Sequence, residues 1–417
     1  MRFRTALAAL CALLLMAEGC LAFSDTADLL DKAEGVTVRL SDVKVQQLTG
    51  NDHGRETLNA FLAPLSAEIA LNAEAARIAV LASGQEVSAL TLEGQKLPDT
   101  GLLPHEAFRR LVTETLPDLF LELLPEEVFE PELRKVKIKN LPSSVQRTVL
   151  SVTQEQLAAC GTLEQLKADW AAMSAYLPHH EEMSAWLANL TAVSALTVQR
   201  LENEAGEPVA WNITGRVSDG GKDVRNLSLY GGVNGLNAYF TLKLPARSGK
   251  STLELTINLK DKAGKKTNTW SGTITCKRRK DGVSYTVKDT VDLENSHSGR
   301  EEISGSVKHE VTEDNIKSVW TLVPELTGDG HQLAGTLKVT KKYAQTRVWQ
   351  VTLAVSAAEG AEIQPGDADE AGFVGGLMTY LQGYVGGLSP EDQRQLSHML
   401  RTDAWLNGPV VPVVTAP

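Results

Sequence analysis

The chain has 417 residues, of which 42% are hydrophobic and 22% are charged, and its formal net charge is −11. These fractions match those of globular proteins and exclude a largely disordered chain. The length exceeds what one ordinary compact core supports, which predicts two or three domains. An acidic chain binds the polyanionic backbone of nucleic acid poorly, so we expect no nucleic-acid partner.

The first 22 residues have the three parts of a secretory signal peptide. Arg2 and Arg4 precede an uncharged apolar run over 5–17, and the segment closes on a small residue, Ala22. The apolar run is too short to anchor the chain across a bilayer. We therefore expect export to an extracytoplasmic location, in the cell envelope of a bacterium.

Two routes of processing remain open. Cleavage before Phe23 would release a freely secreted protein, and this is the favoured prediction. Alternatively, segment 17–20 resembles a weak lipobox, in which case Cys20 would carry lipid and tether the chain to the outer side of the cytoplasmic membrane. The segment departs from the lipoprotein pattern because Ala17 stands where Leu is preferred and Glu18 where a small residue is preferred.

Cys160 and Cys276 are the thiols that remain beyond the signal region. An extracytoplasmic compartment permits disulfides. The two cysteines are far apart in the sequence, however, and nothing local favours their pairing. Two buried thiols are therefore favoured over a disulfide.

The segment before residue 193 divides into two parts. Residues 23–100 predict a small α+β region, with a strand at 36–40, a short helix at 56–65 and two further strands within 68–92. Residues 101–192 have a helical period that prolines interrupt, which predicts several short helices.

Residues 193–357 predict a long antiparallel β-meander. Strand-like runs of roughly ten residues follow one another between turn signals. In one of them Leu253, Leu255 and Ile257 alternate with Glu254 and Thr256, which is typical of a strand with one buried face. Residues 211–357 carry 22 basic and 15 acidic side chains, so this part is basic within an acidic chain and could face an anionic lipid or polymer.

A weak internal repeat places glycines inside these strands, at Gly215, Gly272, Gly305 and Gly335. The intervening strands carry bulky aromatic residues, so we expect glycine on one strand to lie beside an aromatic ring on the next. Interior strand glycines mark bends or close backbone approach. The interpretation is a strongly curved, half-barrel-like sheet, with a β-sandwich or a flat meander as the alternative.

The last part, 358–417, predicts a glycine-rich, helix-like amphipathic segment and a loose tail. Between Ala371 and Leu388 the apolar residues share one helical face, but six glycines make a poor free-standing helix. We expect the segment to fill the concave side of the sheet, with contact to lipid or a partner chain as the alternative.

Motifs for chemistry are weak. Segment 248–252 resembles the end of a phosphate-binding loop but lacks its first glycine, and 179–182 lacks the spacing of a zinc site. Segment 367–370 fails one of the two tests for an EF-hand. We therefore expect no cofactor, no metal and no catalytic residue.

If the sheet curves around a ligand, the aromatic strands line the site. His309 joins them because it alternates with apolar positions, although a buried structural histidine is the commoner reading of that pattern. The candidate ligand-lining residues are Tyr239, Phe240, Tyr285, Trp320, Trp349 and His309.

The layout of residues 193–388 resembles that of the half-barrel carriers that hold lipid or lipoprotein acyl chains. The resemblance is one of architecture and transfers no residue. It implies a non-enzymatic binding protein that presents a curved sheet to a lipid, a peptide or a polymer. The alternatives are an envelope structural or assembly protein that acts through protein contacts, and a hydrolase with a spatially assembled site.

Overall fold

The computed structural model describes most of the chain from residue 36 onward. The described residues are 36–48, 52–71, 75–93, 111–123, 132–135, 144–174, 189–206, 208–218, 224–234, 237–246, 251–280, 282–296, 300–313, 315–329, 332–344, 347–359, 363 and 370–401. The expected signal peptide, Cys20, the 179–182 segment and the C-terminal tail lie outside them.

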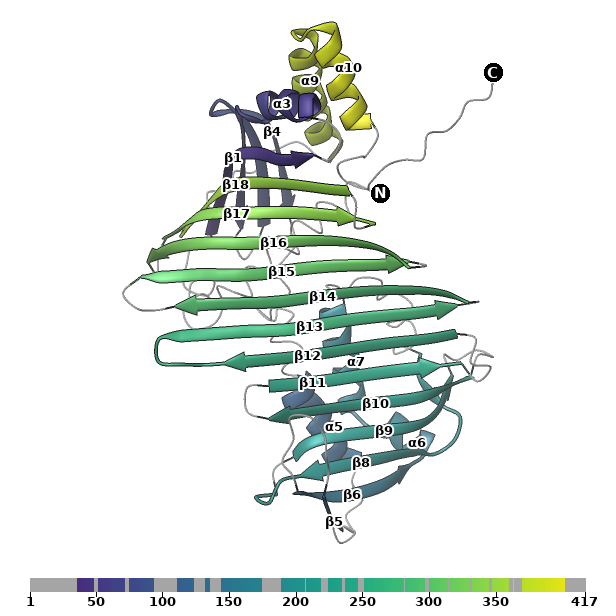
Figure 1. Cartoon of the computed structure of the whole chain (residues 1–417). Coiled ribbons are helices and arrows are strands. Elements are labelled where there is room, and N and C mark those ends of the chain that lie inside the picture. The colour runs from purple at the N-terminus through teal and green to yellow at the C-terminus, as the bar shows by residue number, and fades with distance from the viewer. Residues whose placement is uncertain are drawn as a thin grey trace, which may run out of the picture.

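The described strands form one open sheet of 18 strands (Figure 1). The prediction of a long antiparallel sheet in the second half is confirmed, and the strands belong to one sheet rather than to two packed ones. The strands are β1 (Val36–Leu48), β2 (Leu65–Leu71), β3 (Ala75–Ala82), β4 (Gln85–Glu93), β5 (Glu132–Lys135), β6 (Ser144–Val152), β7 (Thr191–Ala192), β8 (Leu196–Glu202), β9 (Pro208–Ser218), β10 (Val224–Asn234), β11 (Asn237–Pro245), β12 (Ser251–Lys262), β13 (Thr267–Lys280), β14 (Val283–Ser296), β15 (Glu301–Glu313), β16 (Ile316–Asp329), β17 (Gln332–Tyr343) and β18 (Arg347–Glu359).

Strands β8 to β18 form an antiparallel meander in which each strand pairs with the next. At one end β18 pairs with β1, which continues into β2, β3 and β4. At the other end β8 pairs with β6, and β6 pairs with β5. The predicted helical region 101–192 contains helices, but it also supplies β5 and β6 to the sheet.

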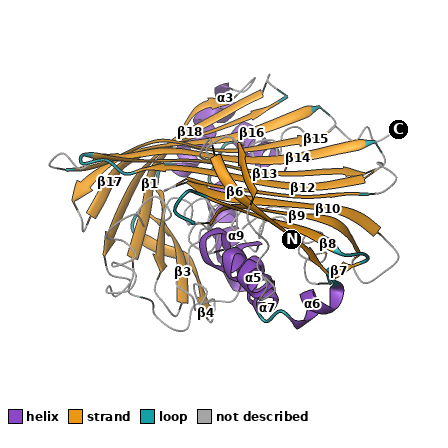
Figure 2. Cartoon of the chain, turned by 90° about the horizontal axis from the view of Figure 1, so that it is seen from below, coloured by secondary structure: helices purple, strands orange, loops and turns teal. Residues whose placement is uncertain are grey.

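The two faces of the sheet differ in polarity, as the alternation in β12 predicts. On the outer face Lys243 and Lys277 lie 3.5 and 3.8 Å from the carboxylate of Glu254, between neighbouring strands. On the inner face Leu255 and Ile257 are buried. All described helices that pack on the sheet contact the inner face, and Figure 2 shows α5, α6, α7 and α9 together on one side of it.

The first group of helices covers the β6–β13 end. It consists of a π-helical turn η1 (Leu111–Thr115) and helices α5 (Leu116–Leu123), α6 (Gln154–Ala159) and α7 (Thr162–Ser174). Leu116, Leu119 and Trp170 from these helices join the largest buried cluster with strand residues such as Phe240 and Leu242. This is the main hydrophobic core of the molecule.

The second group of helices covers the β1–β4 end and comprises α3 (Asp52–Leu62), α9 (Glu370–Gly386) and α10 (Pro390–Arg401). Phe373 of α9 is buried among side chains of β2, β3 and β4. Its carbonyl oxygen accepts a hydrogen bond of 2.9 Å from the Ser88 hydroxyl, and Gly376 allows the helix to approach Ser88 closely. Figure 2 shows β3 and β4 turned away from the long strands, on the side of α9.

The four glycines of the internal repeat do not pair with aromatic residues, so that expectation is wrong for them, although Gly231 in β10 does pair with Trp211 and Phe240. Gly272 pairs with Leu259 and Val291, Gly305 with Leu293, and Gly335 with Leu326 and Val355. The reason for glycine is backbone proximity. A Cβ at Gly305 or Gly335 would overlap the carbonyl oxygen of the neighbouring strand, and Gly305 also has a φ of +130°.

Two further findings concern the thiols and the membrane. Cys160 is buried and Cys276 is half-buried, and both are free thiols. Within the described ranges, no helix is both long and apolar enough to cross a membrane.

Candidate functional site

The inner face has a central patch between the two groups of helices. Leu293, Val307 and Leu322 are buried there, with Val291, Leu337 and Val339 packed against them. All six side chains come from β14, β15, β16 and β17, so the cluster is formed by the sheet itself. The first group of helices shares its cluster with strands as far as β13, and α3 and α9 share theirs with Trp349 and Val351 of β18. Among the described residues, no helix side chain belongs to the cluster of the central patch.

One row of polar and aromatic residues crosses this patch. Successive cross-strand pairs join Asp289 to His309, His309 to Trp320, Trp320 to Lys341, and Lys341 to Trp349. Directly paired residues of an antiparallel sheet point to the same face. The five side chains therefore form one line on the inner face, which we call the central row.

The members of the central row contact one another. His309 Nδ1 lies 2.7 Å from Asp289 Oδ1, and the histidine side chain is 32% exposed while the aspartate is 8% exposed. The Trp320 and Trp349 rings meet edge to face, with centroids 5.8 Å apart. Lys341 is buried, and its Nζ lies 4.8 Å from the centre of the Trp320 ring.

These contacts fix the orientation of the polar groups. A carboxylate only accepts hydrogen bonds, so the Nδ1–H of His309 donates to Asp289 and Nε2 is the remaining polar atom of the ring. The ammonium of Lys341 over an indole ring is a cation–π contact, which contributes about 2 kcal/mol when it is desolvated. The central row thus holds a positioned imidazole and a buried cation.

The rows on the two sides of the central row differ. On one side three rows follow that are almost entirely aliphatic. On the other side the rows are mixed, with Val287, Val311, Ser318 and Tyr343 in the first row and Tyr285, Glu313 and Ile316 in the second. The three aliphatic rows comprise Val291, Val307, Leu322, Val339 and Val351, then Leu293, Gly305, Pro324, Leu337 and Leu353, then Ile303, Leu326, Gly335 and Val355 with Asn295.

The structure brings three of the six predicted ligand-lining residues together, namely His309, Trp320 and Trp349. Tyr285 lies on the same face, two rows away from His309. Its pKa is raised by burial and by the nearby Glu313 carboxylate.

The other two predicted residues lie elsewhere. Tyr239 is on the outer face, where its ring centroid is 5.5 Å from that of Tyr230. Phe240 is on the inner face but is buried in the main core, with its ring centroid 6.2 Å from that of Trp170 in α7.

Sequence reasoning missed Asp289 and Lys341. The signal was present, because both stand at inward positions of alternating strands. Asp289 lies between Val287 and Val291, and Lys341 follows Leu337 and Val339 at two-residue steps. The same pattern identified His309, and its extension to every charged residue in an apolar alternation would have found both.

The two free thiols are poor nucleophiles. Burial, followed by the charge of Asp289, raises the pKa of Cys276 to about 12. Burial, followed by a hydrogen bond to Glu122, raises the pKa of Cys160 to about 11. Both sulfurs stay protonated at neutral pH, and the thiolate is the reactive form.

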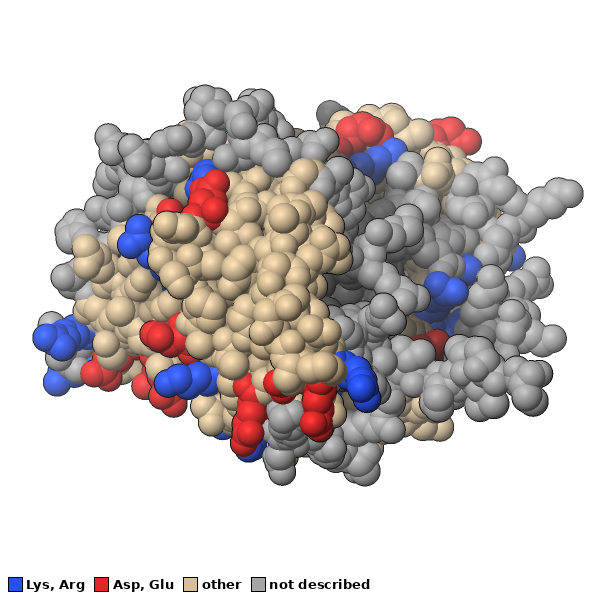
Figure 3. All heavy atoms as spheres, turned by 90° about the horizontal axis from the view of Figure 1, so that it is seen from above, with Lys and Arg blue, Asp and Glu red and all other residues tan. Residues whose placement is uncertain are grey.

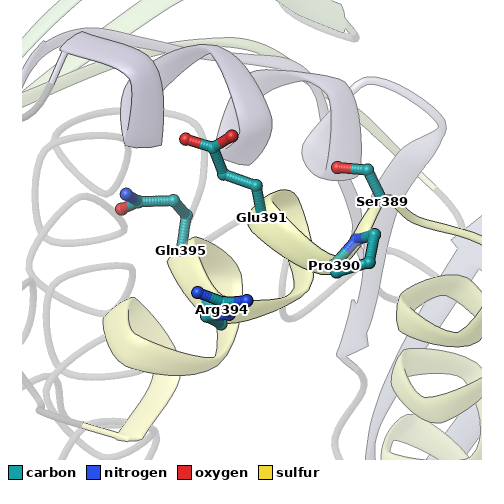
Figure 4. A pocket seen from close by; sticks show the side chains of 5 residues that line it. All are labelled: Ser389, Pro390, Glu391, Arg394 and Gln395. Atoms are coloured by element: carbon teal, nitrogen blue, oxygen red, sulfur yellow. The ribbon is translucent and has the colours of Figure 1, made fainter.

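Other places in the described part of the chain offer less chemistry. An open polar pocket at the start of α10 is lined by Ser389, Pro390, Glu391, Arg394 and Gln395 (Figure 4). It lies at the β1 end, where Figure 3 shows, among the described residues, an uncharged area with Lys, Arg, Asp and Glu around it. The described His, Cys, Asp and Glu residues form no group of three that could hold a metal ion.

The comparisons with known proteins give no family. No protein-family model matches the chain, and no curated protein sequence is detectably similar to it.

Proposed function

We propose that this chain is an exported, non-enzymatic binding protein of the bacterial cell envelope that holds a lipid against the inner face of a curved sheet. The observation that supports this function is the aliphatic patch of β14–β17. Among the described residues its cluster is built by strand side chains alone, whereas the clusters at both ends of the inner face include helix side chains. Leu293, Val307 and Leu322 expose 2%, 5% and 7% of their surface, so the patch supports the proposal as an apolar lining and not as an open surface.

The dimensions of the patch suit one acyl chain. Neighbouring rows lie two residues apart along a strand, so the distance from the first row to the third is about 14 Å. The distance from the first to the fourth strand, across the sheet, is also about 14 Å. One leaflet contributes about 15 Å to the hydrocarbon core of a bilayer. An acyl chain therefore fits along the strands, with room beside it for a second chain.

The curvature of the sheet belongs to the same proposal. Close backbone approach at Gly305 and Gly335 and the turn of β3 and β4 toward the helices favour a sheet that bends around its inner face. Such a bend raises the contact between the aliphatic rows and a lipid, because side chains of distant strands converge on it. Peptide or polymer ligands are less suited, since they require polar partners along their length.

Native mass spectrometry of the mature protein, purified gently from its own host, tests the proposal. A lipid-sized adduct that dissociates on activation is expected. The Val339→Asp variant places a charge in the aliphatic patch and should lose the adduct. The matched Thr340→Asp variant places the same charge on the outer face of the same strand and should keep it.

The intact mass also reports processing. A polypeptide that begins at Phe23 indicates free secretion, and a diacylglyceryl group on Cys20 indicates a membrane tether. A folded wild-type protein without any adduct would overturn the carrier function. The assembly alternative would then be favoured, since Val374 and Met378 of α9 expose 38% and 47% of their surface.

A further inference from the structure

We propose that the outer face of the sheet docks on the surface of an anionic phospholipid bilayer, through a basic band near one end of strands β11–β17. The band consists of Lys243, Lys277, Arg279, Lys288, Lys317 and Lys342. It lies on the opposite face of the sheet from the aliphatic patch. The interaction therefore goes beyond the proposed function and does not depend on it.

The register of the strands brings the six side chains of the basic band together. Lys243 pairs with Glu254, which pairs with Lys277, and from there the line of pairs continues across β14 and β15 to Lys317. Directly paired residues of an antiparallel sheet point to the same face. Figure 1 shows β11–β17 side by side. The neighbouring outer-face rows on either side hold the other three basic residues, Arg279, Lys288 and Lys342.

The basic band is open to solvent. The side chains of Lys277, Lys243 and Lys317 expose 54%, 47% and 45% of their surface. Arg279 and Lys342 are also exposed. The described helices that pack on the sheet contact its inner face, so they do not compete for the band. These cations are accessible to a partner.

The basic band has an excess of positive charge. Among the described outer-face side chains of β11–β17, its rows contain two carboxylates, Glu254 and Glu310, against six basic groups. Glu254 is shared by two lysines, at 3.5 Å from Lys243 and 3.8 Å from Lys277, and Glu310 pairs with Lys317. The carboxylates therefore neutralise only part of the band.

The charge on the outer face is also uneven along the strands. Past a middle row that holds Lys308 and several threonines, the next three rows of β12–β17 carry both signs in nearly equal number. Their charged residues are Lys260, Lys262, Lys338, Asp292, Glu294, Glu302 and Glu325. Mixed signs are typical of a solvated face, whereas one sign gathered at one end produces a field that attracts an anionic partner.

The shape of the basic band favours a planar partner. Lys243 on β11 and Lys342 on β17 are six strands apart in the sheet, which is about 29 Å, and the three rows span about 14 Å along the strands. A linear polyanion meets one line of charges, but a bilayer surface meets the whole area. Each Lys or Arg beside an anionic bilayer strengthens binding by roughly fivefold. Since salt screens charges beyond about 8 Å, the band outweighs the net charge of −11 at the contact.

Vesicle co-sedimentation tests the proposal, with mature protein that begins at Phe23, so that no lipid on Cys20 anchors it. One set of vesicles contains equal parts of phosphatidylglycerol and phosphatidylcholine, and the other contains phosphatidylcholine alone. In roughly 0.1 M salt the protein should bind the anionic vesicles at least about tenfold more tightly. Raising the salt to roughly 0.5 M should abolish the difference.

Two double variants locate the contact. Lys277→Gln with Arg279→Gln removes two charges from the basic band and should weaken binding to the anionic vesicles by about tenfold or more. The matched control, Lys260→Gln with Lys262→Gln, removes two exposed lysines from the other end of neighbouring β12 and should change binding by less than about twofold. Both doubles change the net charge equally, so a difference between them reports position. Far-UV circular dichroism shows whether each variant keeps the fold.

Each contrary outcome is distinct. Equal wild-type binding to the two kinds of vesicle, or an equal loss in the two double variants, overturns membrane docking through the basic band. Binding of soluble dextran sulfate without binding of anionic vesicles also overturns it and indicates an anionic polymer as the partner. None of these results affects the lipid adduct expected in native mass spectrometry, so the proposed function is tested separately.

Discussion

The interior strand glycines lead to a prediction about stability. Gly305 lies in β15 with a φ of +130°, and a Cβ built on it overlaps the carbonyl oxygen of Asp292 and lies 2.9 Å from the Cα of Leu293. Both obstacles are backbone atoms of β14, so no side chain can rotate to make room. We therefore expect Gly305→Ala to be strongly destabilising.

The expected loss has two parts. A non-glycine residue in this backbone region costs about 1–3 kcal/mol, and forcing the strands apart costs about 1–3 kcal/mol more. Gly272 in β13 is the matched control, because its added Cβ would meet the end of the Leu259 side chain at 2.9 Å, which can move. Gly272→Ala should cost less than about 1 kcal/mol, the usual range for sites without such a conflict.

Urea unfolding followed by far-UV circular dichroism measures both variants. The midpoint of Gly305→Ala should fall well below that of Gly272→Ala, which should stay near wild type. Equal midpoints for the two variants would refute the idea that close approach of the β14 and β15 backbones explains the glycine.

Three further predictions concern the helices and the core. The added Cβ of Gly383→Ala in α9 meets no atom within 4 Å, so this variant should stabilise the protein by about 0.5–1 kcal/mol through helix propensity. Gly376→Ala should destabilise it, because its Cβ would lie 2.7 Å from Ser88 Oγ. The melting temperatures of the two variants, compared with wild type, give the sign of each effect. Phe240→Ala should cost about 3–5 kcal/mol because the ring is fully buried, and a urea midpoint close to wild type would contradict its place in the core. Hydrogen bonds, first from the Thr162 side chain and then from Cys160, lower the pKa of Glu122 from 4.5 to about 2, so its contribution to stability is full above pH 4.5 and is lost as the pH falls toward 2. Glu122→Gln should therefore have a lower urea midpoint than wild type at pH 6 and nearly the same midpoint near pH 2. A difference in midpoint that is the same at both pH values would show that Glu122 does not act through its charge.

The candidate site was partly predictable because alternation survives in the structure. His309, Trp320 and Trp349 are inward residues of β15, β16 and β18, and their inward direction follows from the two-residue period of a strand. Tyr239 and Phe240 were grouped with them only because they are aromatic. Adjacent strand residues point to opposite faces, so these two could not line one site together.

The sequence by itself determined the strands and their polarity. Alternation between Leu253 and Leu259 specifies a strand with one apolar face, and the turn signals between the runs specify antiparallel neighbours. These properties depend on residues that are close in the chain, so local pattern is sufficient for them.

The tertiary structure alone decided which residues meet. The pairing of β1 with β18 and of β6 with β8 joins segments that are distant in the chain, and no local pattern encodes it. The line from Asp289 to Trp349 arises in the same way, because it requires the register of five strands at once. A slip of one residue in any pairing would send the rest of the row to the other face, and the buried aliphatic clusters of the inner face oppose such a slip.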